Sequence, residues 1–110
     1  MLKKIGILLL LCLLLTACSK PLPADRMNYA GDWQSSEMRL LILADGSVSY
    51  ERLKNGGTTS IEGPLKEFQG DDFVVGIGPF STTFDVSEPP HEVAGTWHMV
   101  VDGVHLTAIK

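Results

Sequence analysis

Three histidines and an aspartate pair are the residues here whose types could bind a metal ion or move protons. His91, His98 and His105 are spaced seven residues apart. Two facing imidazoles could share a metal, but a zinc site needs three or four ligands. We expect His98 and His105 on one exposed face of neighbouring strands, and a solvated His91 in a loop. The sequence therefore predicts no metal site and no cofactor.

Carboxylates and hydroxyls give no better case for catalysis. Asp71 and Asp72 could do acid–base chemistry as a pair, but they follow a glycine in a turn, where aspartate is favoured for local hydrogen bonds. The hydroxyls at residues 81–83 lie in an expected strand without a G-x-S-x-G turn. No phosphate-binding loop, dinucleotide motif or metal-spaced cysteines occur. We expect a protein that is not an enzyme.

Aromatic residues and prolines are the remaining candidates for contact with a ligand or a partner. Trp33 and Trp97 could stack on a ligand, but their large area favours a place in the core. Phe80 follows a glycine–proline pair. It could form an exposed contact patch with Pro89 and Pro90, or it could close the end of a barrel, and the sequence leaves both possibilities open.

The first 17 residues have the layout of a secretory signal peptide. Lys3 and Lys4 give a positive start, and an apolar run from Ile5 ends at Thr16 and Ala17. The run of 13 residues from Ile5 to Ala17 is too short for a membrane span, which needs about 20. We therefore treat residues 1–17 as a signal peptide.

The four residues at its end, Leu15-Thr16-Ala17-Cys18, resemble the lipobox of bacterial lipoproteins. The resemblance implies cleavage between Ala17 and Cys18, a diacylglycerol on the Cys18 sulfur and an acyl chain, such as palmitate, on the new amino group. Two or more chains hold a protein stably on a membrane. Ser19 is not the aspartate associated with inner-membrane retention, so we expect the outer membrane, with the domain facing the periplasm.

The mature chain is acidic and has no free thiol. Cys12 lies in the signal peptide and Cys18 would carry the lipid, so no disulfide is expected. Without Lys3 and Lys4, seven basic residues remain against 13 acidic ones, a formal charge of −6. This balance argues against nucleic-acid binding and against tight apposition to anionic lipid headgroups.

Residues 18–30 read as the lipidated cysteine and a flexible tether, and residues 31–110 as a small all-β domain. A tether of this length with two prolines would hold the domain about 35–40 Å from the lipid, although Tyr29 could already pack on the domain. Turn signals recur at short intervals from Gly31 onward. We expect strands near 31–36, 38–43, 47–54, 58–62, 65–69, 72–77, 80–86, 96–101 and 104–109. Gly63-Pro64 could mark a bulge within one strand, and residues 87–95 are the longest expected loop.

Turn chemistry and side-chain alternation predict three strand registers. A three-residue loop at 44–46, with Gly46 at positive φ, pairs Ile42 with Val48. A two-residue turn at 55–56 pairs Tyr50 with Ile61. A two-residue turn at 102–103 puts residues 97, 99 and 101 on one face with 104, 106 and 108. Each choice collects the apolar side chains on one side.

Gly31-Asp32-Trp33 resembles the G-x-W start of calycins, the lipocalin-like and avidin-like barrels. In that family the tryptophan closes one end of the barrel, and a basic residue from a late strand stacks on it. Lys110 is the one lysine or arginine beyond Lys66. About eight short strands predict a small antiparallel meander barrel or rolled sheet, mostly filled by its own side chains.

These observations predict a lipid-anchored module of the cell envelope that binds a protein or a small apolar ligand without catalysis. Two alternatives stay open. The protein could be a structural accessory subunit of a larger envelope complex, held by strand pairing at a sheet edge. It could also inhibit a hydrolase that attacks the envelope.

Overall fold

The computed structural model describes residues 20–110. The signal peptide, Ala17 and Cys18 lie outside the described residues. A short 3-10 helix, η1 (Ala24–Tyr29), precedes the strands. The strands are β1 (Gly31–Gln34), β2 (Met38–Ile42), β3 (Ser47–Lys54), β4 (Gly57–Gln69), β5 (Asp72–Ile77), β6 (Phe80–Phe84), β7 (Val86–Val93), β8 (Thr96–Val101) and β9 (Val104–Ala108).

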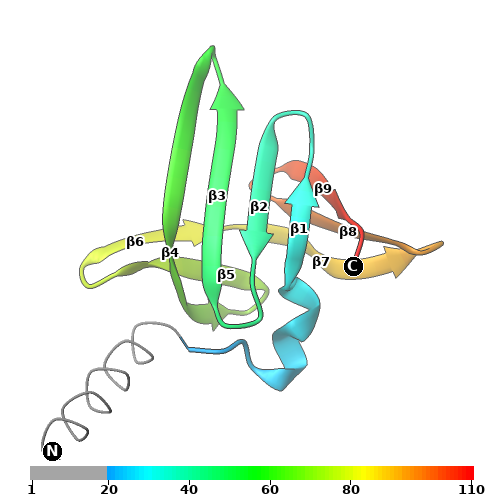
Figure 1. Ribbon diagram of the computed structural model, residues 1–110, viewed down its shortest axis with the longest axis horizontal. Helices are drawn as coiled ribbons and strands as arrows, with labels where there is room; N and C mark the ends of the chain where they lie inside the picture. The colour runs from blue at the N-terminus through cyan, green and yellow to red at the C-terminus, as the bar shows by residue number, and fades with distance from the viewer. Residues whose placement is uncertain (1–19) are drawn as a thin grey trace, which may run out of the picture.

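The strands form one antiparallel sheet in the order β6-β5-β4-β3-β2-β1-β9-β8-β7. Two meanders, β1 to β6 and β7 to β9, are joined by the β1–β9 pair. The sheet curls into a half-barrel, so the chain can pass from β6 at one edge to β7 at the other through Asp85 alone (Figure 1). The predicted all-β rolled sheet is confirmed, with nine strands where we expected about eight.

The three predicted registers are confirmed. Ile42 pairs with Val48, and Gly46 has a φ of 91° in the loop between them. Tyr50 pairs with Ile61 across the turn at 55–56. Trp97 pairs with Ala108 in the β8–β9 hairpin. Short turns join these strands, so local turn chemistry and alternation were sufficient to fix the pairing.

Two expectations about strand limits were wrong. Residues 87–93 are not part of a loop, because β7 continues to Val93 along β8, with register shifts on either side of Glu88. These shifts let the strand pass its proline pair while Val86 and Pro90 stay buried. The strand expected at 80–86 is divided at Asp85 between the two sheet edges. The segments 58–62 and 65–69 are one strand, β4, which continues through Gly63-Pro64. The register shift in its pairing with β5 lies between Leu65 and Glu67.

The described part of the expected tether packs on the domain. Leu22 is buried and its amide donates to the carbonyl of Ala44 at 3.0 Å. η1 then brings Tyr29 into the core, where the indole of Trp33 donates to the Tyr29 carbonyl at 2.9 Å. Because the chain packs on the domain from Leu22 onward, the spacing of about 35–40 Å that an extended chain up to residue 30 would give is too long. No helix within residues 20–110 is long and apolar enough to cross a membrane.

The concave face of the sheet is filled by aromatic and aliphatic side chains. The rings of Phe73 and Phe84 stack with centroids 5.0 Å apart, and the Tyr50 ring meets Phe84 edge-on at 4.9 Å. Burial raises the pKa of Tyr29, whose hydroxyl donates to the carbonyl of Asp71 at 2.8 Å. Among the described residues no polar or charged residue is buried. The mostly filled interior that the short strands predict is present.

Candidate functional site

The three histidines form a ladder across the outer face of β7, β8 and β9. His91 lies opposite His98 with ring centroids 5.7 Å apart, and the rings of His98 and His105 are 5.1 Å apart. His98 Nδ1 lies 2.9 Å from His105 Nε2. The expected shared face of His98 and His105 is present, but His91 lies in a strand and not in a loop. Over residues 20–110 no three potential ligands are placed to hold a metal ion.

The aspartate pair connects elements of the fold. The Asp72 carboxylate accepts the amide of Val86 at 2.7 Å, which ties the start of β5 to the start of β7. Asp71 lies 3.9 Å from the Arg26 guanidinium. Each carboxylate thus has its own structural partner, so the pair is not arranged as an acid and a base. The hydroxyls at 81–83 lie on β6, as expected.

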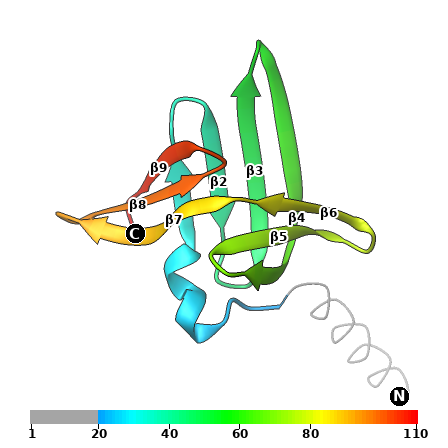
Figure 2. The same ribbon diagram turned by 180° about the vertical axis from the view of Figure 1, so that it is seen from behind.

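The proposed patch of Phe80, Pro89 and Pro90 is not one surface. Phe80 is 81% exposed at the start of β6, whereas Pro90 is buried in β7. β6 leads through Asp85 into β7 across the molecule, so the start of β6 and the end of β7 lie at opposite sides of it (Figures 1 and 2). Pro89 is nine positions beyond Phe80 along mostly extended chain, which corresponds to roughly 30 Å. Phe80 does not close the end of the half-barrel.

The two tryptophans meet a single cation. Trp33 is fully buried, and Trp97 is half-buried against the core. The Lys110 ammonium lies 5.1 Å from the centre of the Trp33 ring and 4.1 Å from that of Trp97. It also donates to the Asn28 carbonyl, and burial lowers its pKa. This cluster fastens the C-terminus near η1, buries Trp33 and places the Lys110 ammonium over one face of Trp97.

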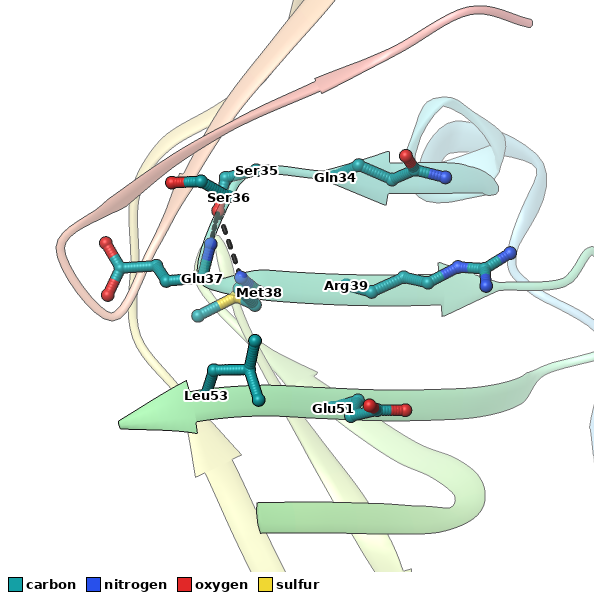
Figure 3. Close-up of a pocket in the computed structure, with 8 residues that line it drawn as sticks. All are labelled: Gln34, Ser35, Ser36, Glu37, Met38, Arg39, Glu51 and Leu53. Carbon is teal, nitrogen blue, oxygen red and sulfur yellow. Dashed lines mark hydrogen bonds between the residues drawn. The ribbon is translucent and has the colours of Figure 1, made fainter. Parts of the chain in front are cut away.

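A hollow of about 210 Å³ opens beside the β1–β2 turn (Figure 3). Ser35 Oγ accepts the amide of Met38 at 3.1 Å and so shapes the turn. The carboxylates of Glu37 and Glu51 lie at opposite ends of the hollow and do not converge. Met38 is the one buried residue that lines the hollow, and no buried polar residue does so. We therefore see no catalytic or ligand-binding arrangement here.

Arg39 of β2, at the rim of this hollow, forms an ion pair with Asp32 of the neighbouring β1. Its guanidinium donates two hydrogen bonds to the Asp32 carboxylate, at 3.0 and 3.2 Å. These bonds from Arg39 are the main reason that the pKa of Asp32 is lowered. The pair is exposed and links β1 to β2.

A second hollow, of about 310 Å³, lies where the described chain begins. Its wall is of mixed charge. The residues that line it are Lys20, Pro21, Leu22, Pro23, Asp25, Arg26, Leu65, Lys66, Glu67 and Phe68. The Arg26 guanidinium lies 4.6 Å from the centre of the Phe68 ring. Three positive and two negative side chains line it, so the hollow has no strong preference for an anion or a cation.

The two edges of the sheet differ in a way that the sequence did not reveal. Within residues 20–110 no strand pairs with the outer edge of β6 or of β7. β7 carries two prolines, two register shifts and the acidic Glu88 and Glu92. Such features discourage pairing with another chain. β6, with the sequence FSTTF, has none of them. The β6 edge is therefore open to an added strand.

The β5–β6 hairpin also exposes apolar side chains at its tip. Ile77 is 69% exposed and pairs with Phe80, which is 81% exposed. Gly78 and Pro79 form the turn between them. The candidate functional site is this hairpin, with its open edge and apolar tip. A sequence signal existed in the uncharged run from Phe73 to Phe84, but Phe80 alone was singled out.

Comparison with known proteins gives no further guide. The chain matches no model of a protein family, no curated protein and no solved structure.

Proposed function

We propose that the protein is a lipid-anchored, non-catalytic binding module of the cell envelope that receives a strand of a partner protein at the edge of β6. Cys18 carries the lipid in this proposal, and the outer membrane, with the domain in the periplasm, is the expected location. The observation that supports it best is the contrast between an open β6 edge and a protected β7 edge.

A filled interior favours a protein partner over a small apolar ligand. A carrier of small molecules needs an enclosed apolar cavity, usually of several hundred Å³. Here the aromatic residues of β3, β5 and β6 occupy the concave face. The hollow beside Lys20 opens at the surface and has a polar, charged rim. Main-chain pairing at an edge, in contrast, needs no cavity.

Strand addition agrees with the chemistry of β6. Ser81 and Thr83 are exposed, and no charged side chain lies on the strand. An incoming strand could form main-chain hydrogen bonds without displacing a charge. This is the arrangement expected of an accessory subunit, which is the form of binding module that we favour. Inhibition of a hydrolase has no comparable support.

The anchor is tested by Cys18→Ala in the full chain. Without the thiol, the protein should be released from membranes or remain unprocessed. The measurements are membrane fractionation and the intact mass. Normal processing and membrane retention of the variant would refute lipidation at this position.

The edge is tested by affinity purification of the lipidated protein from native membranes, with mass spectrometry. Ser81→Lys and Thr83→Lys place charges on the β6 edge and should remove a stoichiometric partner. Ser87→Lys makes the same change of residue on β7 and should leave the partner bound. Equal effects at both edges, or the absence of a stoichiometric partner for the unchanged protein, would contradict the proposal.

A further inference from the structure

We infer that the tip of the β5–β6 hairpin, Ile77-Gly78-Pro79-Phe80, inserts into the surface of the membrane that holds the lipid anchor. This inference rests on the anchor in the proposed function. It adds a second point of contact between the domain and the lipid, and the two contacts together fix the orientation of the domain on the membrane.

The tip has the composition of a segment that enters the apolar side of a lipid surface. Ile77 and Phe80 are more exposed than the other large apolar side chains of the described chain except Ile109. No charged residue occurs from Phe73 to Phe84. Burying exposed apolar area is favourable, at about 25 cal/mol per Å². No charged side chain within Phe73–Phe84 would have to leave water, and the long side chain of Lys66, whose ammonium donates to the Gly78 carbonyl, lets that charge stay at the level of the headgroups.

The chain between the anchor and the domain is short. Leu22 is buried and hydrogen-bonded to Ala44, so the described chain is fixed from that point. Lys20 is two positions beyond Cys18 in the sequence, so their Cα atoms are at most about 7 Å apart. Leu22 is four positions beyond Cys18, so these Cα atoms are at most about 14 Å apart. A lipid on Cys18 therefore keeps this end of the domain beside the bilayer.

The tip lies at the same end as the start of the described chain. Lys20 and Lys66 line one hollow. The Lys66 ammonium donates to the carbonyl of Gly78 in the tip at 2.9 Å. Figures 1 and 2 both show the β5–β6 tip on the side of the domain where the chain enters, opposite the β7–β8 tip. A bilayer held near Lys20 is therefore within reach of the tip.

Charge does not drive this contact. The mature chain is acidic, and around the hollow Lys20, Arg26 and Lys66 are accompanied by Asp25 and Glu67. Insertion of the apolar side chains of the tip, Ile77 and Phe80, does not depend on anionic lipid. We therefore expect the same contact in vesicles of phosphatidylcholine alone and in vesicles that contain phosphatidylglycerol, which agrees with the weak attraction expected between an acidic domain and anionic headgroups.

The test places an environment-sensitive fluorophore on the tip of the full-length, lipidated protein. In the processed chain Cys18 is lipidated and Cys12 is removed, so Phe80→Cys supplies a single free thiol. Val93→Cys is the matched control, because Val93 is 57% exposed at the β7–β8 tip. Each labelled protein is reconstituted into phosphatidylcholine vesicles, with and without a nitroxide on the acyl chain. Ile77→Cys repeats the measurement at the other side of the tip.

The inference predicts that labels at positions 80 and 77 shift to shorter wavelength and are quenched by the nitroxide, whereas the label at 93 is not. If the protein floats with the vesicles but the tip labels remain in water, the inference is overturned and the anchor stands. A shift without quenching would place the tip against protein, such as a second copy, and would also overturn it. Failure to float with vesicles would refute the anchor and the inference together.

Discussion

The two hairpins at the ends of the sheet differ in their outer edges and in the side chains that they expose. In the β5–β6 hairpin the base is buried, the outer edge is uninterrupted and the tip is apolar and exposed. In the β7–β8 hairpin the outer strand carries two prolines and two acidic residues, and its outward face carries histidines. Both hairpins pack on one core. In the function that we propose, this contrast leaves the β6 end of the sheet available for contact and keeps the β7 end from it.

The largest expected difference is between removing a phenylalanine ring at the base of β6 and removing one at its tip. Phe84 is 1% exposed and packs between Tyr50 and Phe73. Phe84→Ala should lower the free energy of unfolding by about 3–5 kcal/mol. Phe80→Ala should change it by less than about 0.5 kcal/mol, because the ring is exposed. Urea denaturation measures both free energies of unfolding. A large loss for Phe80→Ala would contradict the conclusion that the Phe80 ring makes no contact that stabilises the fold.

A smaller effect is expected where the two hairpins are joined. The Asp72 carboxylate holds the Val86 amide at the crossing between the sheet edges. Asp72→Ala should lower the free energy of unfolding by about 1.5–3 kcal/mol, the usual contribution of a hydrogen bond to a charged group. Asp71→Ala is the control, and should cost less than about 1 kcal/mol, because its pair with Arg26 is long and exposed. Equal losses for the two variants would mean that Asp72 does not secure the crossing.

The smallest effect concerns β1, the strand of the first meander that pairs with β9 of the second. The pKa of Asp32 is lowered in the folded state, mainly by hydrogen bonds from Arg39. Its stabilising contribution is therefore complete above the unfolded pKa of about 4, and is lost as the pH falls through the lower folded value. Asp32→Asn should remove less than about 1 kcal/mol at pH 7, because the pair is exposed. The difference from the original protein should vanish at low pH, and a difference that grows on acidification would contradict this assignment.

Turn chemistry predicted the hairpins of this sheet well. The loop at 44–46 and the turns at 55–56 and 102–103 join neighbouring strands, so local residues and alternation were sufficient. The β1–β9 pair joins residues far apart in the sequence. No local signal specifies such a pair, and the crossing from β6 to β7 follows from it. The curled all-β sheet was predicted, but the pairing that joins its two meanders was beyond the reach of local sequence patterns.

The misread segments share a physical cause. Proline pairs and isolated apolar residues usually indicate a loop or a tether, and both occur at residues 21–23 and 87–93. Leu22 and Pro90 are nevertheless buried, because the curled sheet offers them apolar surface that their neighbours in sequence do not reveal. The exposure of Phe80 was left open for the same reason. Tertiary packing decided each case.

Hydrogen exchange of the full-length, lipidated protein is the most direct test of whether the β5–β6 hairpin makes contacts at the membrane. Amide exchange is compared in native membranes and in detergent micelles. The account predicts that residues 77–84 are more protected in membranes, while residues 86–93 exchange equally in both. Equal exchange of both segments in the two environments would contradict it.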